Sequence, residues 1–264
     1  NTGLSVDLVR GIAFWAFVVA FAIKVPIWPF HTWLPDAHTQ APTAGSMILA
    51  GVLLKLGAYG FIRLVIPLFP AQATTTAGIL AILAMLSIVL GAYAAFGQWD
   101  FKRLVAYSSI NHMGFVVMGI AVMAFAYGLQ GRSDSLSYDA IIATNGAVMQ
   151  MFNHGLSAAG MFFLVGVIYS RTHTRDLKEY GGIWTVMPIF GMILIFTSMA
   201  SLGLPGLNGF VGEFMVVRGA WPIFTIQLAL SMLGLLMTGA YILKGIGQTL
   251  HGPLKPRWAG LTEM

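Results

Sequence analysis

Two lysines and one glutamate stand inside or beside long apolar stretches, where ionisable side chains are rare. The most central is Lys55, in the segment MILAGVLLKLGAYGFIRL. A lysine at the middle of a membrane helix costs about 2.5–3.5 kcal/mol on insertion scales. Its side chain, roughly 6 Å long, is too short to carry the ammonium to the membrane surface, so snorkelling explains the residue poorly. We therefore interpret Lys55 as an ion- or proton-transfer residue.

The second lysine, Lys24, comes directly before a proline-rich segment, VPIWPFHTWLPDAH. Because proline lacks a backbone donor and clashes with the preceding turn, we expect a helix break near Pro26. Broken helices in membrane proteins line hydrated cavities or ion sites. Lys24 is therefore a second candidate for proton transfer, and an interfacial anchor is the alternative.

The glutamate, Glu213, follows a second predicted break in SLGLPGLNGFVG, residues 201–212. Glycines and Pro205 cannot sustain a regular helix through this stretch. Glu213 is one of three glutamates in the chain. Two breaks, each beside an ionisable residue, are typical of transporters built from repeats. The alternative is a glutamate that caps or anchors a half-helix.

Two histidines, His112 and His154, also lie in apolar stretches. Neutral imidazole both donates and accepts a hydrogen bond and titrates near neutral pH, which suits a proton relay. Buried histidines held by hydrogen bonds for packing remain an equal alternative. His31 and His38 are seven residues apart with a proline between them, so the histidines do not form a zinc-binding pattern.

The elements that must position these residues are membrane helices. Of the 264 residues, 58% are hydrophobic and 9% charged, against roughly 25% charged in soluble domains. Seven stretches are long enough to cross a bilayer core of about 30 Å, which predicts an all-α polytopic membrane protein. They cover residues 8–30, 46–69, 75–96, 104–127, 140–170, 183–217 and 223–250.

Basic residues outside the two central lysines divide unequally between the two faces that seven spans create. The face of the N-terminus holds four and the other face eight, so the positive-inside rule predicts a cytoplasmic C-terminal end. The first group is Arg10, Arg63, Arg132 and Arg218. The second group is Lys102, Arg103, Arg171, Arg175, Lys178, Lys244, Lys255 and Arg257.

Composition also excludes several functions. The chain has no cysteine, which removes disulfides and thiolate-held iron–sulfur clusters, so we expect electron transfer to occur in other chains. Its net charge of +5 is spread without a basic run, so nucleic acid is not an expected partner. No basic segment precedes the first apolar stretch, so a signal peptide is not expected.

Five segments together resemble the antiporter-like, proton-pumping membrane subunits of respiratory complex I. The motif HTQAPTAG within the first is similar to the M type (subunit 4) rather than the L and N types. The segments are KVPIWPFHTWLPDAHTQAPTAGSMILAGVLLKLGAYGFIRL (24–64), DFKRLVAYSSINHMGF (100–115), GAVMQMFNHGLSAAGMFFLVG (146–166), RTHTRDLKEYGG (171–182) and LPGLNGFVGEF (204–214).

This resemblance implies a fourteen-helix fold with two inverted five-helix repeats, each containing one broken helix. Residues 1–264 would form one integral membrane domain. Within it, 1–69 would hold the last two helices of the first repeat, 70–250 the second repeat, and 251–264 a cytoplasmic tail. The chain would then be a fragment that lacks an N-terminal half-repeat and the last helix. The missing part would include the glutamate that pairs with the first lysine.

The resemblance also implies roles in proton transfer. Lys24 would be the lysine of the first broken helix, and Lys55 would lead to the centre of the channel. Glu213 would lie in the second broken helix, toward the exit. Two histidines would lie between them along the middle of the membrane, and two more on the cytoplasmic side of the first break. The implied residues are Lys24, Lys55, Glu213, His112, His154, His31 and His38.

The expected protein is thus a non-redox translocase subunit of NADH:quinone oxidoreductase, driven by quinone reduction elsewhere. NADH, FMN, iron–sulfur clusters and quinone would bind to partner subunits, with no cofactor in this chain. Expected partners are other membrane-arm subunits, especially the L and N types, and the lipid of an energy-transducing membrane such as the bacterial cytoplasmic membrane. The alternatives are a subunit of a multisubunit cation/proton antiporter or membrane-bound hydrogenase, and a non-conducting scaffold.

Overall fold

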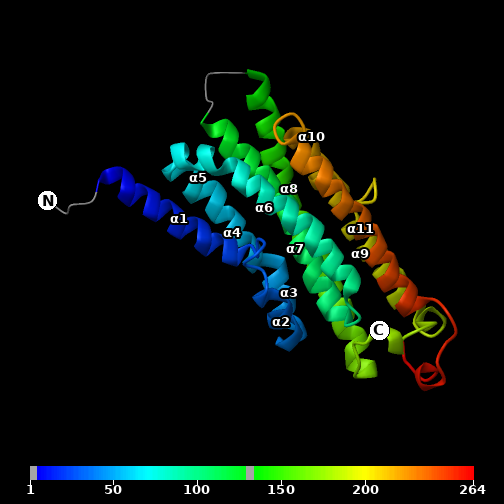
Figure 1. The fold of residues 1–264 in the computed structure, drawn as a ribbon. Helices are drawn as coiled ribbons and strands as arrows, with labels where there is room; N and C mark the ends of the chain where they lie inside the picture. Colours follow the sequence, from blue (N-terminus) through cyan, green and yellow to red (C-terminus); the bar gives the residue numbers. More distant parts are fainter. Residues whose placement is uncertain (1–4, 129–133) are drawn as a thin grey trace.

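The computed structural model describes residues 5–128 and 134–264, and this part of the chain is helical without a β-strand. The long helices run side by side, with α1 at one side of the bundle, α11 at the other, and α6 to α8 between them (Figure 1). The helices are α1 (Val6–Lys24), α2 (Trp33–Gln40), α3 (Thr43–Ile48), α4 (Leu54–Gly60), α5 (Ile66–Leu68), α6 (Pro70–Gly97), α7 (Phe101–Tyr127), α8 (Asp134–Thr172), α9 (Pro188–Leu202), α10 (Asn208–Ala220) and α11 (Thr225–Leu250).

Six continuous helical stretches of the described chain are long and apolar enough to cross a membrane. They confirm the predicted all-α membrane fold, and many of their apolar side chains face outward, as expected where lipid is the solvent. The remaining predicted span, 183–217, is divided between α9 and α10. The stretches are Val6–Lys24, Thr43–Leu68, Pro70–Gly97, Phe101–Tyr127, Tyr138–Thr172 and Thr225–Leu250.

The first predicted break lies where it was expected, but the helix before it is shorter than the apolar stretch. α1 ends at Lys24 rather than continuing to residue 30, and α2 begins at Trp33. Side chains satisfy backbone groups freed by the break, as membrane helices require. Ser87 of α6 accepts a hydrogen bond from Trp28 N–H at 2.9 Å, and the indole of Trp33 donates to the carbonyl of Ile23 at 3.0 Å.

The second predicted break separates α9 from α10. Gly203 and Gly206 adopt φ values of 77° and 99°, in a region that residues other than glycine rarely adopt. The Asn153 side chain of α8 donates to the carbonyl of Asn208 at 2.6 Å and so holds the first residue of α10. The break is therefore determined by local glycines and fixed by the neighbouring helix.

Two π-helical segments, which the sequence analysis did not predict, interrupt the helix that carries Lys55. They cover Leu49–Leu53 and Phe61–Val65, on either side of α4. π-segments inside α-helices occur frequently at functional sites.

The predicted second basic face is a real cluster at one end of the bundle. Arg103 pairs with Asp36 at 3.4 Å, and Arg175 of the loop after α8 pairs with Asp100 at 3.2 Å. In the first basic group, Arg132 lies outside the described residues. The division of the chain into 1–69, 70–250 and 251–264 stays a prediction.

Close backbone packing between α8 and α10 depends on glycine at Gly219. A methyl group there would lie 2.6 Å from the backbone nitrogen of Ala143 and even closer to the carbonyl of Asp139. We expect Gly219→Ala to lower the free energy of unfolding of the full-length subunit by about 1–3 kcal/mol, the usual cost of overpacking. Thermal unfolding of the subunit in its native membrane assembly measures this.

The control is Gly78→Ala in α6, where an added methyl would meet nothing within 4 Å. It should leave the unfolding temperature unchanged or slightly raised, because alanine favours helix more than glycine does. Equal losses in the two variants would contradict the packing argument.

Candidate functional site

Lys55 of α4 and His154 of α8 meet inside the bundle. The Lys55 Nζ atom lies 2.7 Å from His154 Nδ1 and also donates to the carbonyl of Ala50, within the first π-segment. Because an ammonium only donates, Nδ1 must accept when Lys55 is charged, and the proton of neutral His154 is then on Nε2. The π-segment thus supplies an oxygen to a charge that the bilayer would otherwise penalise.

His154 is followed by a second buried ring, that of His112 from α7. The ring centroids are 5.6 Å apart, and the side chains are 2% and 3% exposed. Two protonated rings at that distance would repel by about 3 kcal/mol at an effective dielectric constant of about 20. The pair therefore holds one added proton far more readily than two.

His112 in turn contacts Glu213 of α10. His112 Nδ1 lies 2.8 Å from Glu213 Oε1, and the amide of Gln150 donates to the same oxygen at 2.8 Å. The glutamate is 5% exposed, so its carboxylate depends on these contacts for stabilisation. Four ionisable side chains from four helices consequently form one series, Lys55, His154, His112 and Glu213, in which Lys55 is half-buried and the other three are buried. We call this series the Lys55–Glu213 line.

Tyr241 and Gln150 also contact this line, and the sequence analysis missed both. The hydroxyl of Tyr241, on α11, lies 3.2 Å from His112 Nε2. If the hydroxyl donates to Nε2, the remaining proton of neutral His112 is on Nδ1 and points to Glu213. Gln150 stands one helical turn before His154, a spacing that could have identified it. Tyr241 gives no comparable local signal.

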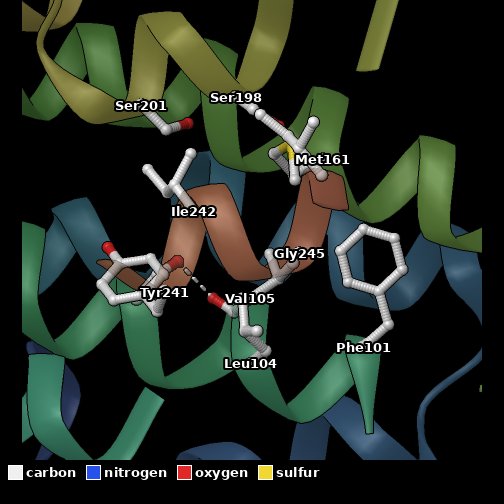
Figure 2. Close-up of a pocket in the computed structure, with 11 residues that line it drawn as sticks. Phe101, Leu104, Val105, Met161, Ser198, Ser201, Tyr241, Ile242 and Gly245 are labelled. Carbon is white, nitrogen blue, oxygen red and sulfur yellow. Dashed lines mark hydrogen bonds between the residues drawn. The ribbon is translucent and has the colours of Figure 1, made fainter. Parts of the chain in front are cut away.

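A small enclosed cavity lies beside Tyr241, between α7, α8, α9 and α11 (Figure 2). Its volume is about 20 Å³, close to what one water molecule needs. Figure 2 shows Ser198 and Ser201 of α9 across the cavity from the Tyr241 side chain, and Ser108 of α7 completes the set of hydroxyl groups. The hydroxyl groups of α9 thus face the same cavity as Tyr241, which contacts His112.

The other three predicted residues form no hydrogen bond or ion pair with this line among the described residues. Lys24 ends α1 close to Gly57 of α4, and its ammonium has no hydrogen-bond or ion-pair partner within the part of the chain that the structure describes. His31 lies in the first break. His38 is fully buried and stacks on Phe162 with ring centroids 4.3 Å apart, and neither ring nitrogen has a partner among the described residues. Their proton-transfer roles stay predictions.

The geometry suits the exchange of protons better than the binding of a metal. No group of three or more histidine, aspartate or glutamate side chains that could hold a metal ion occurs within residues 5–128 and 134–264. The Lys55–Glu213 line instead consists of groups that can gain and lose protons. Hydrogen bonds join Lys55 to His154 at one end and His112 to Glu213 at the other.

Gln150→Leu should destabilise the site because it removes a donor from a buried carboxylate. We expect the free energy of unfolding to fall by about 1.5–3 kcal/mol, the range for hydrogen bonds to charged groups. Thermal unfolding of the full-length subunit in its assembly is the measurement. Gln98→Leu, which removes only a bond to the carbonyl of Ala94 at the end of α6, is the matched control. A larger fall in the free energy of unfolding for Gln98→Leu than for Gln150→Leu would contradict the stabilising role of Gln150 at Glu213.

The chain is similar to known membrane subunits along most of its length. A family described as NADH:quinone oxidoreductase/Mrp antiporter, TM, matches residues 5–133 and 134–238. NADH-quinone oxidoreductase subunit M of Rhodobacter capsulatus is 45% identical over 246 residues, and that of Escherichia coli strain K12 is 44% identical over 243 residues. These matches cover 93% and 92% of this chain and 45% of each relative. The chain thus spans about half the length of the curated relatives it matches.

Two solved structures resemble the fold. A chain of respiratory complex I from Thermus thermophilus with bound NADH superposes with a TM-score of 0.84 at 31% identity, over 95% of this chain and 50% of that one. A chain of the Mrp complex from Dietzia sp. DQ12-45-1b superposes with a TM-score of 0.82 at 19% identity, over 93% of this chain and 43% of that one. At 19% identity the likeness concerns the fold alone.

Proposed function

This chain belongs to the NADH:quinone oxidoreductase/Mrp antiporter transmembrane family, and we propose that it is a proton-translocating membrane-arm subunit of a respiratory NADH:quinone oxidoreductase. The observation that carries the proposal is the Lys55–Glu213 line. It holds a lysine, two histidines and a glutamate in contact, in a chain whose helices are otherwise apolar. Ionisable groups at this depth mark ion and proton pathways in membrane proteins.

In the proposed mechanism, protons move along the line by exchange between neighbouring groups. His154 Nδ1 is placed to take a proton from Lys55, and His112 Nδ1 is placed to give one to Glu213. The two rings repel each other when both are charged. A proton that arrives at His154 therefore favours the release of a second proton already held by His112. Hydration or the movement of an acidic partner would switch Lys55 between holding and releasing its proton.

The energy for this transfer would come from quinone reduction in partner chains. NADH, FMN, iron–sulfur clusters and quinone would bind there, since this chain has no cysteine to ligate a cluster. The partners would include the L- and N-type antiporter-like subunits. The eight-residue basic face would lie on the cytoplasmic side, with Lys24, His31 and His38 serving proton uptake and Glu213 proton exit.

Lys55→Met should abolish most proton pumping while the complex still assembles. Methionine keeps an unbranched side chain but cannot carry a proton, and a positioned acid–base group typically contributes about 10²–10⁴-fold in rate. The measurement is proton uptake per NADH oxidised in sealed vesicles that contain the full-length complex. Lys244→Met is the control, because Lys244 binds the carbonyls of Phe96 and Gln98 at the bundle end and contacts no member of the line. Normal pumping by Lys55→Met would overturn the proposed role.

Glu213→Gln tests the other end of the line. Glutamine preserves the shape and an acceptor oxygen for Gln150, but it cannot take a proton from His112. We expect proton pumping to fall by about a hundredfold, with assembly unchanged. Glu179→Gln, in an exposed ion pair with Arg257, should pump normally.

Normal assembly combined with lost pumping separates the proposal from the scaffold alternative. A non-conducting scaffold predicts normal pumping whenever the complex assembles, even when Lys24 and Lys55 are both neutral. Measuring the amount of assembled complex in each vesicle preparation decides between the two.

The second candidate function is that of a subunit in a multisubunit cation/proton antiporter. The family description, which includes Mrp antiporters, favours it, whereas the 44–45% identity to NADH-quinone oxidoreductase subunits supports the first proposal. Co-purification of the full-length subunit distinguishes them, because only the first predicts partner subunits that oxidise NADH.

A further inference from the structure

A second site lies at the basic end of the bundle, away from the Lys55–Glu213 line. A pocket of about 480 Å³ opens between the link from α2 to α3 (residues 39–43), the start of α7, the end of α8 and the loop that follows it. Two cations line it, those of Lys102 and Arg175, and its lining includes no carboxylate. We call it the Lys102 pocket.

Lys102 is a buried cation that forms no ion pair with any residue the structure describes. Its side chain is 7% exposed, and its ammonium donates to the carbonyl of Ala41 at 2.6 Å. No carboxylate of the described chain lies within ion-pair distance of this ammonium, and the neighbouring Asp100 pairs with Arg175 instead. Buried charges are normally paired, because desolvation without a partner costs several kcal/mol.

The guanidinium of Arg175 is the second cation of the pocket. Its guanidinium donates to the carbonyl of Thr39 at 2.9 Å and pairs with Asp100 at 3.2 Å. Asp100 therefore balances one of the two cations and leaves the pocket with an excess positive charge. Guanidinium groups suit phosphate oxygens because their planar donors bind two oxygens at once.

We propose that the Lys102 pocket binds a phosphate group, with Lys102 and Arg175 as its cationic contacts. Its position favours the headgroup of a membrane phospholipid over free phosphate. The pocket lies at the end of the membrane-spanning stretch Tyr138–Thr172, at the depth where lipid headgroups are found, and Tyr169, which lines it, is 43% exposed. Basic pockets between membrane helices bind anionic headgroups in this way.

The test uses the full-length subunit in its assembled complex, reconstituted in phosphatidylcholine nanodiscs with increasing phosphatidylglycerol. Native mass spectrometry counts the retained phosphatidylglycerol, and a parallel series adds inorganic phosphate as competitor. Loss of one cation should weaken retention about fivefold, because a basic residue at the membrane surface contributes about 1 kcal/mol. We expect this result for both Lys102→Gln and Arg175→Gln.

Lys255→Gln is the matched control, since it removes a lysine from the same basic face outside the pocket. Arg175→Lys should restore most of the retention that Arg175→Gln loses. If Lys102→Gln does not assemble, the two Arg175 variants still decide the outcome. Competition by inorganic phosphate would identify free phosphate as the source of the same chemistry. Equal lipid retention by Arg175→Gln and Lys255→Gln, without phosphate binding, would overturn the proposal.

Discussion

The architecture depends on one constraint, the cost of ionisable groups in an apolar interior. A lone charge at mid-membrane costs about 2.5–3.5 kcal/mol, so a partner on a neighbouring helix stabilises an ionisable group there. The Lys55–Glu213 line provides such partners by placing a cation and a carboxylate at opposite ends of two histidines. Gln150 and Tyr241 add hydrogen bonds to the same groups. These contacts join the four ionisable groups of the line with two further polar side chains in one network.

Small residues beside the ionisable groups allow the helices to approach closely enough for these contacts. Gly155, directly after His154, packs so closely on Gly51 that an added methyl would lie 2.9 Å from its carbonyl. Gly212, directly before Glu213, packs on the backbone of Gln150 with a corresponding distance of 2.9 Å. Each glycine therefore shortens the distance that the neighbouring polar side chain must cover. Close packing and the polar contacts of the line therefore depend on adjacent residues of the same helix.

The sequence predicted what depends on local chemistry. Proline and glycine determine the two breaks, and apolar length determines the spans, so these features could be recognised without the structure. The end of the first span was placed too late, at residue 30, because the apolar stretch continues past the last helical residue, Lys24. Contacts between distant segments were beyond local reasoning. Lys55 and His154 are 99 residues apart, and His112 and Glu213 are 101 residues apart. No local spacing in the sequence relates the members of either pair.

The distribution of the line over four helices has a consequence for coupling. Lys55 belongs to the helix between two π-segments, whereas Glu213 follows the glycine-rich break between α9 and α10. Both ends therefore lie beside irregular backbone, whose hydrogen bonds are more easily rearranged than those of a continuous helix. The central histidines instead occupy the long helices α7 and α8. A change of backbone at either end would alter the hydrogen bonds of one terminal group, and the repulsion between the two rings would transmit the resulting charge change across a fixed centre.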